Sequence, residues 1–578
     1  MNQICTSLAL LFLCLRLPAQ EANSPQNLLI REVNVVVLAS ESILEGQDVL
    51  IEEGVIRHIA PSIPLTEEQQ AYLQVDGKDL YLTAGWIDAH IHFFQSGGIY
   101  TRPDALDLRA IKPYEQERYE TRALAEDFMR RYLAAGVTSI CDVGGPMENY
   151  QIREKSRSVM APEVYVTGPL ISTYVPKELE VDDPPIIKAS SAEDAKAMVQ
   201  AQLISKPDFI KIWFIVFPGE SPEDSRRLVE AAIAESHLHG IPVAVHATQL
   251  ETARLAVELG ADILVHSVSD KEVDDRFIAL LLERNVSYIP TLQVSENYDL
   301  AFKNKLPFTE ADFLLANPFT LGSLMDLRHL PAGQLPAWLS RFRAMPDNSS
   351  KTNEIMFNNL KRISDAGVNV VTGTDAGNIG TLHASSYFAE WSMMTEAGLS
   401  PAQILRASTL HGATMLGLQA TSGAVASGMR ADLVLLTHNP LDSLPGASDI
   451  RYVVKGGNLL SPGSLISSDP ESMAQRQLNA YNARNLEAFV ACYSEEVEVY
   501  QFPDQLQGKG RAYLREGYGP MFENTPGLHC ELVNRITVGN KVIDQEKVRR
   551  FGEGRILDAV AIYEVKQGLI SKVYFIVE

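Results

Sequence analysis

The strongest constraint on the fold is a long middle segment in which short apolar runs alternate with amphipathic ones. Between about residues 81 and 419, eight apolar runs recur, with helical patterns such as "PEDSRRLVEAAIAESHLHG" between them. Runs without polar alternation are typical of parallel strands buried on both faces. With helical crossovers, they predict an α/β fold, a (β/α)8 TIM barrel. We expect its strands at 86–92, 137–143, 164–170, 209–215, 242–248, 263–268, 286–292 and 368–377.

Two β-rich flanks surround this segment. Residues 28–80 and 420–460 carry β-branched runs and glycine-centred turns, for example "NLLIREVNVVVL" and "IRYVVKGGN". We interpret both flanks as one small β-sandwich into which the barrel (81–419) is inserted. The long stretch 293–367, between the last two predicted strands, is expected to be a lid or a substrate wall.

The last part of the chain changes character again. A Ser-, Pro- and Gly-containing linker at 461–470 leads into an amphipathic helix and several strands. Residues 466–578 therefore predict a separate α+β domain.

The first residues, "MNQICTSLALLFLCLRLPAQ", predict an export signal over 1–20. An apolar stretch precedes a small-residue cleavage site at Pro18-Ala19, so we expect a periplasmic or extracellular protein. The stretch is too short to span a bilayer, and Cys14 lacks the small residues that precede a lipid-anchored cysteine. An uncleaved anchor or a wrongly assigned start is the alternative.

Charge narrows the classes of partner. The chain has 50 basic and 73 acidic residues, a net charge of −23. This argues against binding nucleic acid or an anionic membrane, because like charges repel phosphate. We expect a small-molecule substrate and no membrane span.

Two histidines stand one residue apart in the apolar run "YLTAGWIDAHIHFF". Strand side chains alternate with a period of two, so His90 and His92 point to the same side. They lie where the first barrel strand ends, and the carboxyl ends of barrel strands carry the active site. Two adjacent imidazoles predict a metal site.

Other metal-capable groups lie at the ends of later predicted strands. They are Lys211 in "FIKIWF", His246 in "VAVHAT", His266 in "ILVHSV" and Asp375 in "VTGTDAG". One such residue is more often a packed core residue, but packing alone explains the full set poorly.

Lys211 is the most informative of these residues, because a charged lysine inside a barrel is costly unless it is paired. An ammonium cannot bind a metal. A lysine carbamate, formed with carbon dioxide, has two oxygens that can bridge two cations. The alternative is an ammonium paired with Asp375 or with a substrate carboxylate.

The motifs "GWIDAHIH", "FIKIWF", "VHAT", "LVHSV" and "GTDAGN" resemble the amidohydrolase superfamily, particularly its imidazolonepropionase-like and prolidase-like metal-dependent hydrolases. The resemblance covers about 28–460. It implies two divalent metal ions, zinc being the usual one. His90, His92 and Asp375 would hold one ion, His246 and His266 the second, and carboxylated Lys211 would bridge them.

The resemblance also implies a mechanism, the hydrolysis of an amide C–N bond in a small molecule or dipeptide. A metal-bridging hydroxide would attack the carbonyl, and Asp375 would shuttle the proton to the leaving nitrogen. Tyr288 could bind substrate or simply pack in the barrel, and His383 could line the pocket or cap a helix.

The C-terminal segment resembles the nuclear-transport-factor-2-like cone of ketosteroid isomerases and polyketide cyclases (SnoaL-like), on stretches such as "QRQLNAYNARNLEAFVACY" and "AVAIYEVKQGLISKVYFI". Such cones enclose a pocket and often dimerise, so we expect a homo-oligomer, with this domain as a candidate contact. Candidate polar groups of the pocket are Tyr481, Tyr500, His529, Asp544 and Glu546.

Other functions stay open. The same barrel could serve a lactonase or a deaminase, and a catalytically silent barrel would leave a binding protein. A bifunctional enzyme is a further alternative, in which the C-terminal cone binds or isomerises the product of the barrel.

Overall fold

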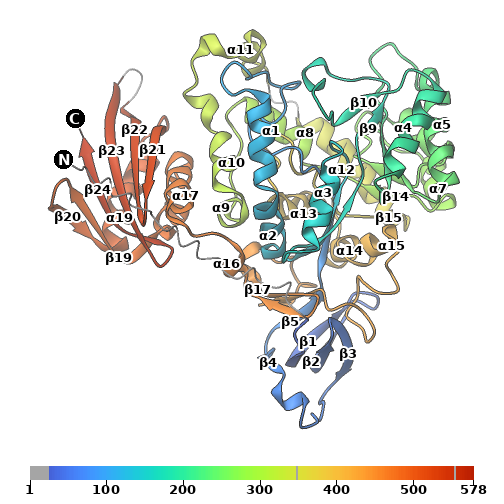
Figure 1. Ribbon diagram of the computed structural model, residues 1–578, viewed down its shortest axis with the longest axis horizontal. Helices are drawn as coiled ribbons and strands as arrows, with labels where there is room; N and C mark the ends of the chain where they lie inside the picture. The colour runs from blue at the N-terminus through green and yellow to red at the C-terminus, as the bar shows by residue number, and fades with distance from the viewer. Residues whose placement is uncertain (1–24, 347–348, 552–554, 578) are drawn as a thin grey trace, which may run out of the picture.

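The computed structural model describes residues 25–346, 349–551 and 555–577. Figure 1 shows three units: a β-rich unit at the bottom, a larger unit of strands and helices above it, and a C-terminal unit beside the larger one. No helix within these residues is long and apolar enough to cross a membrane. The predicted export signal and its cleavage site lie outside the described residues.

The two flanks form one sheet of eight strands in the order β18-β17-β16-β5-β1-β2-β3, with β4 paired to β1. The strands are β1 (Leu28–Val37), β2 (Ser42–Glu52), β3 (Val55–Ala60), β4 (Leu73–Asp76), β5 (Tyr81–Ala84), β16 (Leu433–Leu436), β17 (Ile450–Lys455) and β18 (Asn458–Leu460). The sheet encloses its own core, in which Leu28 and Val49 from the first flank pack with Leu433 and Val454 from the second. Its strands thus belong to one continuous sheet rather than two, and they include β5, which the sequence interpretation assigned to the barrel.

The larger unit, here the parallel-strand domain, contains two parallel sheets. One has the order β6-β7-β8 and the other β10-β9-β11-β12-β13-β14-β15. Their strands are β6 (Trp86–Ile91), β7 (Val137–Asp142), β8 (Glu163–Val166), β9 (Leu170–Ser172), β10 (Ile186–Lys188), β11 (Ile210–Trp213), β12 (Val243–His246), β13 (Ile263–Val265), β14 (Ser287–Ile289) and β15 (Asn369–Val370).

The two sheets are joined by backbone hydrogen bonds at two places. At one junction the backbone amide of Asp375 donates to the carbonyl of His90 at 2.7 Å, and at the other Asp208 donates to Val166 at 3.0 Å. These bonds lie outside the continuous strand ladders, so closure into the predicted eight-stranded barrel stays a prediction. They do bring the end of β6 against the segment that follows β15.

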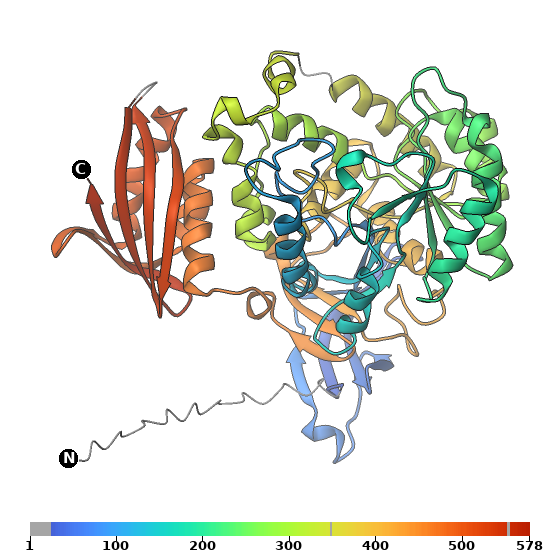
Figure 2. The ribbon, with the colours of Figure 1, turned by 45° about the horizontal axis from the view of Figure 1, so that its top comes forward.

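Helices follow most of these strands and cover the sheets (Figure 2). The helix α7, for example, begins where Asp274 accepts a hydrogen bond from the amide of Phe277, and it buries Phe277 and Leu281. The covering helices are α1 (Tyr114–Ala123), α2 (Ala125–Ala134), α3 (Asn149–Ser156), α4 (Ala192–Leu203), α5 (Arg226–Leu238), α6 (Leu250–Glu258), α7 (Asp275–Glu283), α13 (Ser386–Glu396), α14 (Pro401–Ala407) and α15 (Leu410–Met415).

The insertion between β14 and β15 is helical. It contains α8 (Val294–Phe302), α9 (Glu310–Leu315), α10 (Pro318–Ser323), α11 (Ala337–Arg343) and α12 (Ser349–Asp365). Its own apolar cluster includes Phe302, Leu321 and Leu339, together with Ile99 and Leu106 from the loop after β6. The insertion is therefore packed onto the loop that follows the two histidines.

The C-terminal unit is a six-stranded sheet with helices on one side, in the order β20-β19-β24-β23-β22-β21. Its elements are α17 (Pro470–Ala483), α18 (Leu486–Ala491), β19 (Tyr493–Gln501), β20 (Gln505–Lys509), α19 (Gly510–Asn524), β21 (His529–Val538), β22 (Lys541–Phe551), β23 (Arg555–Lys566) and β24 (Leu569–Val577). The short helix α16 (Pro462–Leu465) precedes this unit and contacts α2 and β17.

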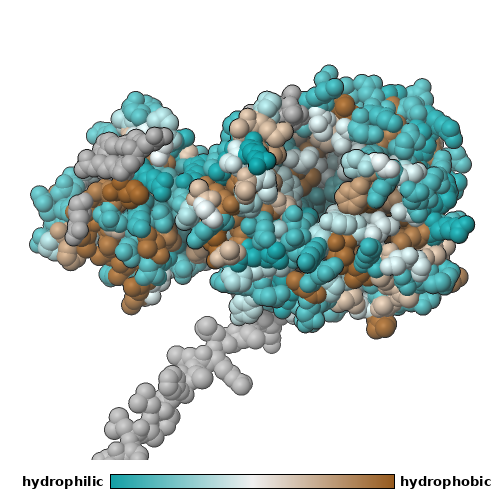
Figure 3. All heavy atoms as spheres, turned by 90° about the horizontal axis from the view of Figure 1, so that it is seen from above, coloured by the Kyte–Doolittle hydropathy of each residue, from teal (hydrophilic) through white to brown (hydrophobic). Residues whose placement is uncertain are grey.

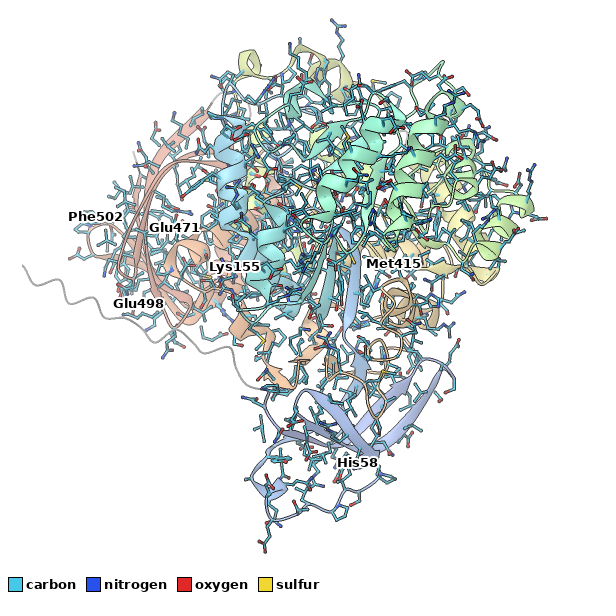
Figure 4. The ribbon with its side chains drawn as sticks, turned by 45° about the vertical axis from the view of Figure 1, so that its right-hand side comes forward. His58, Lys155, Met415, Glu471, Glu498 and Phe502 are labelled. Carbon is cyan, nitrogen blue, oxygen red and sulfur yellow. The ribbon has the colours of Figure 1, made fainter. Side chains whose placement is uncertain are left out.

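Helix α17 of this unit packs on α10 of the insertion. Asn479 donates to the carbonyl of Pro318 at 2.6 Å, and Arg328 donates to the carbonyl of Asn482 at 2.8 Å. Gly322 lies so close to α17 that a Cβ there would be 2.6 Å from the Gln475 side chain. In Figure 4, Glu498 and Phe502 lie on the opposite side of the C-terminal unit, away from this contact.

Candidate metal centre

The six predicted ligands lie at or just after the carboxyl ends of parallel strands. His90 lies in β6 with His92 just after it, Lys211 lies in β11, and His246 ends β12. The remaining two follow β13 and β15: His266 and Asp375. Because parallel strands end on the same side of their sheet, these side chains converge.

Three of them converge within reach of one cation. His90 Nε2 and His92 Nε2 are 3.2 Å apart, and Asp375 Oδ1 lies 3.4 Å and 3.1 Å from them, respectively. All three ligand atoms lie within 4.8 Å of one another. Ligands about 2.0–2.2 Å from a zinc ion lie about 3.4 Å apart at tetrahedral angles, so this spacing fits a metal seat.

A second pair of histidines lies next to this group. The rings of His246 and His266 are 4.4 Å apart between centroids, and those of His266 and His90 are 5.0 Å apart. His266 Nδ1 is 2.7 Å from Thr291 Oγ1 and 3.8 Å from Asp375 Oδ2. His266 therefore lies between the first group and His246.

Burial keeps these imidazoles neutral. It lowers the pKa of His246 to about 3 and the pKa values of His90 and His266 well below their usual range, with nearby Lys211 and the other histidines adding to the effect. A neutral imidazole has the lone pair that a metal needs.

The orientation of His92 is fixed by the loop after β7. Its Nδ1 lies 2.8 Å from the carbonyl oxygen of Gly144. Because a carbonyl can only accept, Nδ1 carries the proton and Nε2 presents its lone pair to His90 and Asp375.

Lys211 is 1% exposed, and its Nζ has no hydrogen-bond partner within the described residues. Burial lowers the pKa of Lys211 to about 7, although Asp375 opposes this shift. A buried amine without a partner is costly unless a further group binds there.

The aspartate and the last histidine have unusual backbone conformations. The φ angles of Asp375 and His266 are +60° and +77°, values that residues other than glycine rarely adopt. Such strain is common where a side chain must be held in one functional direction.

A cavity of about 410 Å³ opens over this group, and Figure 3 shows the larger unit hollowed near its centre when seen from above. The insertion contributes Val294, Tyr298 and Met356 to its wall. The cavity also has an apolar part of its wall, made by Leu170, Leu179, Ile186 and Trp213.

Neither predicted substrate residue, Tyr288 or His383, lines this cavity. Tyr288 is fully buried and accepts a hydrogen bond from the amide of Val268 at 3.0 Å. His383 is also buried, and its ring stacks on Phe128 at 4.2 Å while Nε2 donates to the carbonyl of Gln95 at 2.9 Å. Both side chains pack within the domain, which agrees with the packing alternative for Tyr288. His383 neither lines this cavity nor caps α13, whose N-cap residue is Ser385.

Sequence reasoning missed three residues next to the predicted ligands. Asn378 donates to Asp375 Oδ1 at 2.8 Å, and it accepts from Arg102 and Tyr298 at 2.7 Å each. Asn378 stands in the quoted motif "GTDAGN", three residues after the aspartate, so it could have been found. Arg102 and Tyr298 lie in a loop and in the insertion, where no periodic pattern marks them.

Asp88 was also missed. It is fully buried and accepts hydrogen bonds from the amide and the hydroxyl of Thr374 at 3.1 Å and 2.8 Å. Burial raises the pKa of Asp88 to about 7. It lies two residues before His90, so the same period of two could have identified it.

The candidate polar groups of the C-terminal unit do not form one site. Asp544 and Glu546 are buried on the inner face of the sheet. Tyr500 instead stacks on Tyr574 at 5.0 Å, and its hydroxyl donates to a partly exposed carboxylate. His529 lies 2.9 Å from His329 of the insertion, at the contact between units.

The last of these candidates, Tyr481, belongs to an aromatic cluster. Its ring contacts Phe489 and Phe522 at centroid distances of 6.2 Å and 5.6 Å. The cluster lies among the buried apolar residues of the unit, so packing accounts for the position of Tyr481.

Comparison with known proteins identifies the two parts of the chain. The amidohydrolase family matches residues 81–460, and the SnoaL-like domain matches residues 474–573. An imidazolonepropionase of Rubrobacter xylanophilus is 36% identical over 107 residues, 18% of this chain and 26% of that protein. A 5-methylthioadenosine/S-adenosylhomocysteine deaminase of Caldanaerobacter subterraneus is 34% identical over 126 residues, 20% of this chain and 28% of that protein.

The matched region thus spans only about a quarter of the length of these curated relatives. Among solved structures, a Xaa-Pro dipeptidase with bound methionine is 19% identical, with a TM-score of 0.58. The match covers 75% of this chain and 100% of that one, a likeness of fold.

Proposed function

Because this chain belongs to the amidohydrolase family, we propose that it is a metal-dependent hydrolase that cleaves the C–N bond of an amide in a small molecule or dipeptide. One observation carries the proposal: the ligand atoms of His90, His92 and Asp375 lie within 4.8 Å of one another at the base of a cavity.

The donor set fits two divalent cations, with zinc the first candidate. His90, His92 and Asp375 would hold one cation, and His246 and His266 the other. Lys211 would bridge them as a carbamate. Its Nζ has no hydrogen-bond partner among the residues that the structure describes, and its pKa is lowered. Both support this role, because a neutral amine reacts with carbon dioxide and an ammonium does not.

The chemistry then divides between the cations and the protein. When bound, the cations would polarise the substrate carbonyl and lower the pKa of the attacking water. Asp375 would accept a proton from that water at Oδ2 and deliver it to the leaving nitrogen.

The apolar wall of the cavity suggests the kind of substrate. Its aromatic surface continues outward, since the ring of Tyr174 lies 6.1 Å from Trp213 and 5.0 Å from Phe217. Tyr174 and Phe217 are 38% and 43% exposed. Exposed aromatic side chains that continue a cavity favour an apolar group next to the scissile amide.

A second candidate is deamination, which the likeness to a deaminase favours. It also breaks a C–N bond with an activated water. Lys211, whose Nζ has no hydrogen-bond partner in the described part of the chain, argues for the binuclear hydrolase, because a site with one metal has no evident use for this buried amine. Lactone hydrolysis uses the same attack on a carbonyl and belongs in the same substrate screen.

We assign the C-terminal unit an accessory role, the holding of a ligand or the formation of a homo-oligomer. Its outer sheet face carries a row of apolar side chains across neighbouring strands, Ile536, Ile543, Ile562 and Tyr574. Ile536 is 51% exposed. A bifunctional protein, whose cone acts on the product, is the alternative. Export to the periplasm or the outside of the cell also stays part of the proposal.

The first experiment is to measure metal content per chain in protein purified with bicarbonate. About two zinc ions per chain, followed by hydrolysis in a library of dipeptides and N-acyl amides, would support the proposal. One ion would favour deaminase and imidazolone substrates. No bound metal, and no activity on adding it, would overturn the proposal in favour of a binding protein.

A further inference from the structure

The side chain of Asn378 connects the metal centre to the insertion and to the loop after β6. It is 3% exposed. Its Oδ1 accepts two hydrogen bonds, from Arg102 Nη1 and from the hydroxyl of Tyr298, each at 2.7 Å. Its Nδ2 donates to Asp375 Oδ1 at 2.8 Å and to the backbone carbonyl of the same residue at 3.1 Å.

These contacts fix which way the amide points. If the amide were reversed, its NH2 group would face two donors, and its oxygen would face two oxygens of Asp375. Arg102 is itself held by two bonds to Asp104, at 2.8 Å and 2.6 Å. The amide therefore presents a donor to Asp375 in a rigid frame.

The two oxygens of Asp375 are made unequal as a result. Oδ1 faces both His90 Nε2 and His92 Nε2, and it also accepts the bond from Asn378. Oδ2 faces His266 Nδ1 at 3.8 Å, which is beyond hydrogen-bond distance. One oxygen is thus placed and restrained, and the other is left to accept a proton.

We propose that Asn378 is a positioning residue that holds Asp375 Oδ1 in the ligand position and leaves Oδ2 for proton transfer, with Tyr298 and Arg102 fixing the amide. This inference rests on the proposed function, because it assigns two roles to the two oxygens of one carboxylate. It also makes the insertion part of the metal centre, since Tyr298 lies on α8.

The sharpest test is Asn378→Asp. This change keeps the shape and the acceptor for Arg102 and Tyr298, but it replaces the donor with an oxygen that repels Asp375. Partners of metal ligands typically change metal affinity or activity 10- to 100-fold when they are mutated. We expect zinc affinity, measured by competition with a chelator, and kcat at saturating zinc each to fall by about that factor. KM should change less than about threefold, because the substrate cavity keeps its shape.

Asn149→Asp is a matched control. Asn149 also donates to a buried aspartate, from Nδ2 to Asp142 Oδ2 at 2.7 Å, but Asp142 is not a predicted ligand. It should lower the melting temperature and leave zinc affinity and kcat within about threefold. Equal losses in the two variants would mean a general packing defect and would overturn the proposal.

A milder variant keeps the test informative if Asn378→Asp does not fold. Tyr298→Phe removes one of the two donors to Asn378 and should lower kcat and zinc affinity in the same direction, about two- to fivefold. Unchanged zinc affinity and unchanged kcat in both variants would overturn the inference. Zinc competition needs no substrate, so a wild type that binds zinc but hydrolyses no amide would contradict only the proposed function.

Discussion

The cavity over the candidate metal centre, here called the mouth of the parallel-strand domain, and the pair of Arg535 and Asp544 in the C-terminal unit both contain buried ionisable side chains, but these side chains differ in their hydrogen-bond partners. At the mouth, Lys211 Nζ and His90 Nδ1 have no hydrogen-bond partner within the described residues. In the C-terminal unit, the carboxylate of Asp544 receives two hydrogen bonds from Arg535, both at 2.7 Å. Arg535 also donates to Gln475 at 2.8 Å.

The difference separates two uses of buried charge. A paired carboxylate and guanidinium complete each other and leave nothing for a ligand to satisfy. Buried groups without partners leave a favourable position for a group from outside, such as a metal ion or carbon dioxide. The comparison therefore assigns the chemistry to the mouth and a structural role to the pair in the C-terminal unit.

The largest expected effect comes from Lys211→Ala. If Lys211 serves metal binding as proposed, the variant loses bound metal, and kcat/KM falls at least about a thousandfold. Metal analysis and kinetics measure this together. Short-chain carboxylic acids such as acetate should restore part of both, because they replace the carbamate oxygens. A variant with full metal content would remove Lys211 from the site and weaken the comparison.

The convergence of these candidate ligands could be predicted because the geometry of a strand depends only on its own residues. The period of two placed His90 and His92 on one side, and the repeat of strand and helix brought Lys211, His246 and His266 to one end. The same geometry could not decide whether Tyr288 points to the cavity or to the packing around the strands.

Loop contacts were beyond this reasoning for a physical reason. Arg102 and Asn378 are 276 positions apart, and their contact depends on how two irregular loops pack. No periodicity reports such packing. Likewise, the docking of the C-terminal unit on α10 depends on the shape of both surfaces at Gly322, which a single glycine in the sequence does not reveal.

The second prediction concerns the paired side of the comparison. Asp544→Ala leaves Arg535 buried without its carboxylate, which costs about 3–5 kcal/mol of unfolding free energy. Calorimetry should show the loss, while kcat stays within about twofold. Replacing both partners by apolar residues, Asp544→Leu with Arg535→Met, should recover most of the stability. A large fall in kcat at full folding would make the C-terminal unit catalytic.

The third prediction uses a buried carboxyl in the parallel-strand domain that accepts hydrogen bonds but, within the described residues, has no cationic partner. Glu390 is fully buried and accepts from the amide of Leu292 at 2.8 Å. Burial raises the pKa of Glu390 to about 8 from its usual 4.5. The folded chain therefore binds this proton more tightly than the unfolded chain, so stability is full below about pH 4.5 and falls as the pH rises through 8.

Glu390→Gln removes this dependence. Its melting temperature should match that of the wild type near pH 4 and exceed it by a few degrees near pH 9. Thermal unfolding across this range measures the difference between the two proteins. A difference in melting temperature that stays the same at every pH would mean that the pKa of Glu390 is not raised by its burial. Hydrogen-bond donors alone would then stabilise its charge as well as Arg535 stabilises the charge of Asp544.

The smallest effect on activity should come from weakening the contact between the C-terminal unit and the insertion of the parallel-strand domain. A leucine at position 322 would meet the side chains of Gln475 and Asn479 on α17, both within 3 Å of a Cβ at this position. Gly322→Leu should therefore loosen the contact between α10 and α17 and make residues 466–469 more sensitive to proteolysis. The contacts between the two units, such as those of Asn479 with Pro318 and of His529 with His329, involve none of the predicted metal ligands, so kcat should stay within about threefold. A large loss of activity with bound metal retained would show that the C-terminal unit acts on the mouth through α10, and the division of roles would then have to be abandoned.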